Sequence, residues 1–185
     1  TARQGTLDVV YGVLTSDGSG VEYATYLGGT STGSWFSANP SLRVASDGGA
    51  VVAFYDNATD VQTTSGAFQT ANAGGFDIVV SRLTATRTLA WTTYYGGNVN
   101  EDLETHTLAL TASDAPIIAG RTASKNLPTT TGGIQPSPGS SSSGDRDGFI
   151  AALSSDGRQV LAATYLGGTG TDEVEGVAPG NRQTV

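Results

Sequence analysis

The feature that most constrains the fold of this chain is a short phrase that occurs three times. It reads Ala-Thr-Tyr-Leu-Gly-Gly at residues 24–29, Thr-Thr-Tyr-Tyr-Gly-Gly at 92–97 and Ala-Thr-Tyr-Leu-Gly-Gly at 163–168. The tyrosines of this Gly-Gly phrase are separated by 68 and 71 residues. Recurrence at a nearly constant spacing indicates a repeated structural unit. We therefore expect a repeat protein.

Short runs rich in β-branched and aromatic residues alternate with turn residues along each unit. Residues 8–14 and 21–27 flank an Asp-Gly turn, which is a strong signal for a hairpin. No long stretch has a persuasive 3.6-residue apolar period, so almost no helix is expected. The predicted strands are 8–14, 21–27, 42–45, 50–55, 76–83, 89–95, 105–110, 115–119, 147–153 and 160–166.

The restarts of this pattern divide the chain into repeat 1 (8–76), repeat 2 (77–146) and a partial repeat 3 (147–185). Four antiparallel strands in each unit are typical of a propeller blade. We therefore predict an all-β fold. It is a single open segment of β-propeller type, with about two and a half four-stranded antiparallel blades.

A closed propeller needs roughly four to eight blades, which is more than this chain supplies. An open segment leaves unpaired strand edges, and such edges are templates for association. Three explanations are open: the chain is a fragment of a longer protein, several copies assemble, or the unit is not a blade. The absence of an initiator Met at Thr1 and the abrupt end at Val185 favour a fragment, with assembly close behind.

Composition excludes several classes of partner. The chain has 9 basic and 17 acidic residues and a net charge of −8 at pH 7. Such a surface repels nucleic acids and anionic membranes, so neither is expected as a partner. No apolar run approaches the roughly 20 residues of a membrane-spanning helix. Disulfide bonds are impossible because the chain has no cysteine, and this leaves the redox compartment open.

The repeated segments resemble the bacterial β-propeller repeat family known as SBBP repeats. The matching segments are the three Gly-Gly phrases and residues 63–69, 77–83, 128–135 and 147–153, and together with their spacing they cover nearly the whole chain. The resemblance implies a β-propeller in an exported bacterial protein, often a large secreted or surface one. It implies no reaction, since the family has no shared catalytic set and propellers host many functions.

Clustered carboxylates follow two of the three Gly-Gly phrases. The weak candidates for a metal site are Glu101, Asp102, Asp172 and Glu173, because carboxylate oxygens suit a hard cation such as Ca²⁺. The corresponding loop of repeat 1 has no carboxylate, which favours solvated loops without a cofactor over a calcium site. Glu101, Asp102 and Glu104 are also considered as a glycosidase pair, and there too solvated loops are favoured.

Aromatic residues take the place of these carboxylates in repeat 1. Trp35 and Phe36 follow the first Gly-Gly phrase and are the weak candidates for ligand binding. An exposed aromatic pair can stack on a sugar ring or anchor a partner protein. Burial beneath the loop is an equally favoured alternative. Trp91 lies in a predicted strand and is expected in the core or between blades.

No catalytic constellation emerges from the sequence. His106 is the only histidine and has no partner at a spacing suited to general-base catalysis or metal binding, so we expect a partly exposed side chain. A single histidine and no cysteine disfavour a Ser-His-Asp or Cys-His site. Asp8, Asp77 and Asp147 recur at strand starts, where each is expected to accept N–H bonds from the adjoining turn.

These observations predict a non-enzymatic structural or adhesive module of a bacterial secreted or cell-surface protein. Its expected partners are the rest of a longer propeller chain or further copies of itself, and assembly into a fibre or surface structure is considered. The alternative is a lectin-like module that binds a glycan or a surface protein, with or without Ca²⁺. An enzyme is the least favoured class, since the sequence offers only acidic loops for it.

Overall fold

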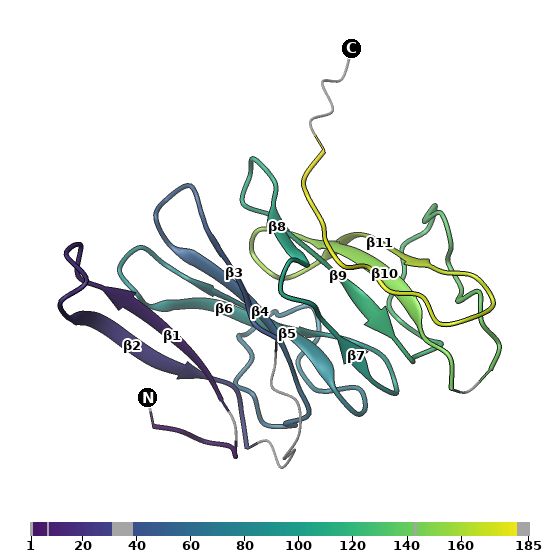
Figure 1. Cartoon of the computed structure of the whole chain (residues 1–185), viewed down its shortest axis with the longest axis horizontal. Helices are drawn as coiled ribbons and strands as arrows, with labels where there is room; N and C mark the ends of the chain where they lie inside the picture. The colour runs from purple at the N-terminus through teal and green to yellow at the C-terminus, as the bar shows by residue number, and fades with distance from the viewer. Residues whose placement is uncertain (1, 7, 31–38, 143, 181–185) are drawn as a thin grey trace.

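The computed structural model describes residues 2–6, 8–30, 39–142 and 144–180 (Figure 1). These residues form eleven strands and no helix, which confirms the all-β prediction. The strands are β1 (Val9–Leu14), β2 (Val21–Leu27), β3 (Ser41–Val44), β4 (Ala50–Asp56), β5 (Asp77–Leu83), β6 (Leu89–Tyr95), β7 (Glu101–Asp102), β8 (Leu108–Leu110), β9 (Pro116–Thr122), β10 (Asp147–Leu153) and β11 (Val160–Leu166).

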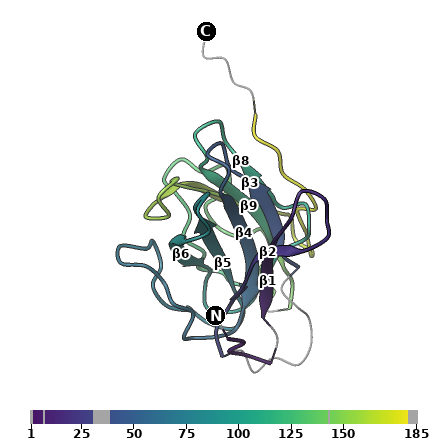
Figure 2. The ribbon, with the colours of Figure 1, turned by 90° about the vertical axis from the view of Figure 1, so that its left-hand side faces the viewer.

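The strands form three antiparallel sheets that follow one another along the long axis of the molecule (Figure 1). Sheet 1 contains β1 and β2, and sheet 2 has the order β3-β4-β5-β6. Sheet 3 has the order β11-β10-β9-β7, and β8 also pairs with β9. A view from the side of sheet 1 shows sheets 2 and 3 behind it (Figure 2).

Strand pairing crosses the boundaries of the sequence repeats. Strand β4 of repeat 1 pairs along its whole length with β5 of repeat 2, from Ala50 opposite Leu83 to Asp56 opposite Asp77. Each complete sheet therefore takes strands from two repeats. The sequence repeats predict that the four strands of one repeat form one blade, and the observed pairing differs. Local turn signals predict the hairpins but carry no information on which hairpins lie side by side.

Two apolar clusters hold the three sheets together. The first lies between sheets 1 and 2, and the second between sheets 2 and 3. The sheet 1–sheet 2 cluster contains Val9, Tyr11, Ala50, Val52, Phe54, Ala58, Val61, Val79, Leu83 and Tyr94. The sheet 2–sheet 3 cluster contains Val51, Ala53, Tyr55, Ile78, Val80, Trp91, Tyr95, Leu103, Leu108, Ile118, Leu127, Phe149, Ala151, Leu153, Ala163 and Tyr165.

Alternation along the strands gives each sheet two distinct faces. We call the face turned toward the following sheet the forward face, and the face turned toward the preceding sheet the rear face. In sheet 2 both faces are covered, so the adjacent Tyr94 and Tyr95 of the Gly-Gly phrase are both fully buried on opposite sides. Sheet 1 contributes its forward face to the core, and sheet 3 contributes its rear face.

The three hairpins β1–β2, β5–β6 and β10–β11 share two features, although the turn of β5–β6 is one residue shorter than the other two. Each has a register shift at the end of its first strand, a β-bulge that leaves one residue of the second strand without a direct cross-strand partner. Each turn also has a residue with positive φ at the same position: Gly18 (71°), Arg87 (66°) and Gly157 (70°). These shared features allow residues of the three sheets to be compared position by position.

Candidate functional site

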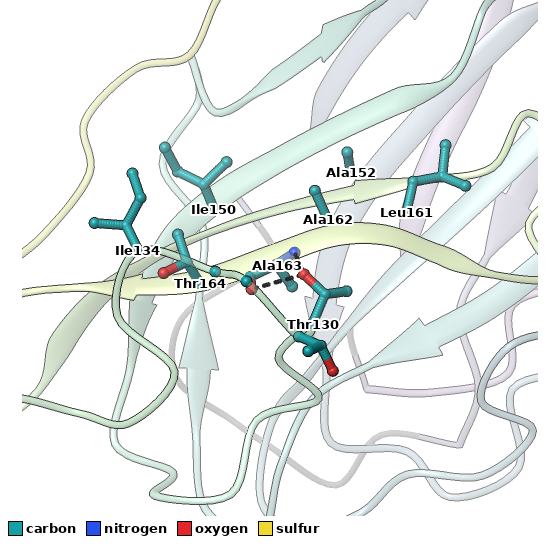
Figure 3. A pocket seen from close by; sticks show the side chains of 11 residues that line it. Thr130, Ile134, Ile150, Ala152, Leu161, Ala162, Ala163 and Thr164 are labelled. Atoms are coloured by element: carbon teal, nitrogen blue, oxygen red, sulfur yellow. Dashed lines mark hydrogen bonds between the residues drawn. The ribbon is translucent and has the colours of Figure 1, made fainter.

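An exposed apolar surface at one end of the described structure is the part of the forward face of sheet 3 that β10, β11 and the loop before β10 form (Figure 3). A cavity of about 350 Å³ lies over this face. Ile134 and Leu161 are 88% and 55% exposed there, with Ile150 and Ala162 between them on β10 and β11. The loop that carries Ile134 is anchored to β11, because Thr130 donates its amide to the carbonyl of Ala163 at 3.1 Å.

The equivalent face of sheet 2 is covered by sheet 3. Val80 and Tyr95 are fully buried there, and Trp91 is buried as predicted. The Nε1 of Trp91 donates to the carbonyl of Ser155 at 2.9 Å, across the two sheets. The pairs of equivalent residues in sheets 2 and 3 are Phe68 and Ile134, Val80 and Ile150, Trp91 and Ala162, and Tyr95 and Leu166.

At the opposite end, the rear face of sheet 1 carries exposed apolar residues. Val10 and Leu14 are each 61% exposed, and Tyr26 is 40% exposed. Val10 lies directly opposite Tyr26 in the β1–β2 ladder, and Leu14 lies on the same face four residues further along β1. Their equivalents in sheets 2 and 3 are buried within the two clusters: Val79, Leu83, Tyr94, Phe149, Leu153 and Tyr165.

The acidic segment after the second Gly-Gly phrase is not the solvated loop that the sequence analysis favoured. Glu101 is fully buried and pairs with Thr122 as the first residue of β7. Its carboxylate accepts hydrogen bonds from the Gly97 amide at 2.9 Å and the Thr122 hydroxyl at 2.6 Å. Burial raises the pKa of Glu101. These hydrogen-bond donors offset the free-energy cost of burying the Glu101 carboxylate. The composition of the segment alone does not reveal them.

Asp77 lies beside Glu101 beneath the Gly-Gly phrase, where a Cβ at Gly96 would collide with both carboxyl groups. Asp77 accepts hydrogen bonds from the Ala73 amide at 2.8 Å and from Gln69 at 2.7 Å, which agrees with the role predicted for strand-start aspartates. Its Oδ1 is buried and has no hydrogen-bond donor among the described residues. Burial raises the pKa of Asp77 to about 7, and the charge of Glu101 adds to this shift.

The other two strand-start aspartates have similar surroundings. Asp8 accepts hydrogen bonds from the amides of Gln4 and Gly5, at 3.0 and 3.2 Å. Asp147 is fully buried and accepts from the Gly139 amide. The predicted structural role therefore holds in all three repeats.

A second, polar cavity of about 390 Å³ lies near the junction of sheets 2 and 3. Tyr55 and Phe76 line it as an edge-to-face pair with ring centroids 5.7 Å apart. Arg121 and Arg146 also line it, and both donate to the carboxylate of Asp102. The cavity also contains the side chains of Asn39, Asn100 and Glu104.

The four weak metal candidates occupy separate environments. Asp102 and Glu173 both accept from Arg121, at 3.1 and 3.0 Å, while Glu101 is buried on the other side of β7. Asp172 accepts from the Gly168 amide at 2.7 Å. Among the described residues, no three acidic or histidine side chains converge in a group that could hold a metal ion.

The remaining candidates are placed as follows. Trp35 and Phe36 lie outside the described residues. His106 is exposed and lies before β8, outside the strand predicted at 105–110, and its Nδ1 lies 3.2 Å from the hydroxyl of Thr105. The polar cavity was missed by the sequence analysis because its residues come from segments far apart in the chain. The sequence shows that Asp102 and Arg121 carry opposite charges, but it does not show that they form an ion pair.

This geometry defines an all-β repeat protein of stacked antiparallel sheets, with exposed apolar residues on the end sheets of the described structure. No protein-family model matches the chain, and no curated protein matches it significantly. Within the described ranges, no helix is long and apolar enough to cross a membrane.

Proposed function

We propose that the chain is a non-enzymatic structural or adhesive repeat module of β-propeller type, from a bacterial secreted or cell-surface protein. Its sheets play the role of blades, and its partners are further units of the same kind. The resemblance to SBBP repeats supports the export and the bacterial origin. The turn-rich, acidic composition suits an extended surface protein, because a net charge of −8 opposes nonspecific association.

One observation carries this proposal. The forward face of each of the first two sheets packs on the rear face of the next, with equivalent residues at equivalent positions. Such nearest-neighbour stacking is the principle of repeat architectures, in which one unit cannot bury its apolar faces alone. The chain thus acts as a segment of a stack that further units extend.

Localisation in the source organism tests this proposal. Antibodies raised against the purified chain should label intact cells or the culture medium. A cytoplasmic marker on the same cells serves as the control and should remain unlabelled until lysis. Labelling that appears only together with the cytoplasmic marker would contradict a surface or secreted role.

A second candidate function is glycan binding, and the polar cavity favours it. Saccharide sites combine an aromatic surface with planar polar side chains that hydrogen-bond hydroxyl groups, and cavities of roughly 300–1,000 Å³ are typical for small ligands. Tyr55 and Phe76 supply the rings, and Asp102, Arg121 and Arg146 supply the polar groups. The paired charges favour a neutral sugar over an ionic one.

A glycan array, read with and without Ca²⁺, tests this candidate. Asp102→Asn should weaken binding of any neutral glycan at least about tenfold, because hydrogen bonds to charged groups are worth roughly 1.5–3 kcal/mol. Glu22→Gln is the matched control, since Glu22 forms an ion pair with Arg87 away from the cavity. The candidate is excluded if no glycan binds, or if both variants bind like the parent chain.

A further inference from the structure

We propose that the forward face of sheet 3 docks the rear face of sheet 1 of a second copy of this chain, giving a head-to-tail assembly. This inference rests on the proposed stacking function and names its partner. Two interfaces of the same kind already exist within the chain, between sheets 1 and 2 and between sheets 2 and 3. The proposed contact is a third one, formed between molecules.

The rear face of sheet 1 has the chemistry that this role requires. Tyr26 occupies the position of Tyr94 and Tyr165, and Leu14 occupies that of Leu83 and Leu153. These four equivalents are at most 1% exposed in their sheets, whereas Tyr26 and Leu14 are 40% and 61% exposed. The same residue types are therefore buried in the apolar clusters in two sheets and exposed in the first.

The forward face of sheet 3 carries smaller side chains than the forward face of sheet 2 at two equivalent positions. Ala162 stands at the position of Trp91, and Leu166 at that of Tyr95. Of these two smaller side chains, Ala162 lines the cavity of about 350 Å³. A large side chain of the incoming sheet, such as Tyr26 of a second copy, can enter this space and bury apolar surface on both sides.

The hairpin turns of sheets 2 and 3 also contact the preceding sheet in the stack. The carbonyl of Gly157 accepts the amide of Phe68 at 3.0 Å, and Arg87 donates to Glu22 at 2.5 Å. Ile134 is the equivalent of Phe68, and its amide makes no hydrogen bond within the described part of the chain. In the docked pair, this amide donates to the carbonyl of Gly18 of a second copy.

Leu161 provides a further contact at the same turn. It stands at the bulge position that Glu22 occupies in sheet 1. Glu22 reaches the turn of sheet 2 through Arg87, so Leu161 should reach the turn of the incoming sheet 1. There Gly18 has no heavy atom within 4 Å of a Cβ position, which leaves room for the leucine side chain.

The two docking faces differ, so the contact is heterologous and repeats along a fibre or closes into a ring. Sedimentation velocity of the purified chain should show a mass that rises with concentration from 18.7 kDa. Because each copy carries a charge of −8, added salt should strengthen the association by screening the repulsion. A chain that remains monomeric up to about 1 mM would overturn the proposal.

Two variants block one face each. Leu161→Asp places a charge on the forward face, and Val10→Asp places one on the rear face. Each variant alone should lose self-association at least about 30-fold, because an unpaired charge would be buried. An equimolar mixture should form a 1:1 pair, since each variant retains the face that the other lacks. A mixture that stays monomeric would refute the head-to-tail arrangement.

Val99→Asp is the matched control, because Val99 is 40% exposed in a loop outside both faces. It should associate like the parent chain, and circular dichroism should show that all three variants fold. A Val10→Asp variant that still self-associates would show that two forward faces dock, which also contradicts the proposal. If sedimentation shows only monomers while antibodies label the cell surface, the docking proposal is rejected and the proposed surface function still stands.

Discussion

At the scale of single residues, a tyrosine of the Gly-Gly phrase in sheets 2 and 3 ties the second strand of a hairpin to the loop that leads into that hairpin. The hydroxyl of Tyr94 donates to the carbonyl of Ala58 at 2.7 Å and accepts from the amide of Val61 at 3.2 Å. Tyr165 makes the equivalent two bonds in sheet 3. The repeated phrase therefore has a structural role in these two sheets.

Removal of this hydroxyl should destabilise the fold without changing its shape. Tyr94→Phe leaves two buried backbone groups without a partner, which costs about 1–3 kcal/mol in the free energy of unfolding. Tyr11→Phe is the control, because the buried Tyr11 forms no hydrogen bond through its hydroxyl among the described residues. Urea denaturation measures both variants, and equal stabilities would contradict this role of the tyrosine.

The carboxyl pair beneath Gly96 predicts a dependence of stability on pH. The pKa of Asp77 rises from 3.8 to about 7 on folding, chiefly through burial, so the folded state binds a proton that the unfolded state releases. This stabilisation is fully present below pH 3.8 and is lost as pH rises through about 7. Burial raises the pKa of Glu101 as well, which acts in the same direction.

Asp77→Asn should therefore flatten the stability profile between pH 4 and 8. The parent chain should lose on the order of 2–4 kcal/mol across this range, since each unit of pKa shift corresponds to about 1.4 kcal/mol. Asp114→Asn is the control, because the hydroxyl of Ser46 and a backbone amide lower the pKa of Asp114 and keep its titration below this range. Denaturation at several pH values measures the slopes, and an unchanged slope in Asp77→Asn contradicts the assignment.

At the scale of structural elements, the hairpin turn is the unit of contact between neighbouring sheets. Gly157 lies against the indole of Trp91, and a Cβ at Gly157 would come within 2.5 Å of Cε3. Gly18 has nearly the same φ, but a Cβ at Gly18 would have no heavy atom within 4 Å. Arg87 at the same position of sheet 2 shows that a side chain is tolerated when no ring covers the turn.

The different surroundings of Gly18 and Gly157 allow two matched variants to be compared. Gly18→Ala should cost about 1 kcal/mol, the strain of a left-handed backbone. Gly157→Ala should cost that strain plus about 1–3 kcal/mol, because the new methyl group displaces Trp91 from the sheet 2–sheet 3 cluster. Thermal denaturation followed by tryptophan fluorescence measures both, and equal losses would mean that the turn contributes nothing to the interface.

The strands could largely be predicted from the sequence, whereas the sheets could not. Alternating apolar residues and Asp-Gly turns predict both strands of hairpin β1–β2 within one residue, because this information is local. The pairing of β4 with β5 depends on the path of residues 57–76, which brings β5 alongside β4. No short-range sequence pattern encodes that path. Strand β7 was missed for a related reason: Glu101 is polar, and only its tertiary donors make its burial possible.

At the scale of the whole molecule, stability should decrease from the middle sheet toward the ends. Sheet 2 is covered on both faces, and every residue of β4 is buried. Sheet 1 has two strands and one covered face, and β1 pairs only with β2 in the described structure. Regions with few buried contacts open most readily, so local unfolding should begin at sheet 1.

Hydrogen exchange at low protein concentration measures this gradient directly. Amides of β4 and β5 should exchange slowest and those of β1 and β2 fastest, with an intermediate rate for β11 at the other uncovered end. Raising the concentration should slow exchange in β1, β2 and β11 and leave β4 and β5 unchanged, because association covers only the end faces. Leu161→Asp serves as the control, since it should abolish this dependence on concentration. Uniform exchange across the three sheets, or slowing confined to sheet 2, would show that the end faces are not the labile and associating parts of the molecule.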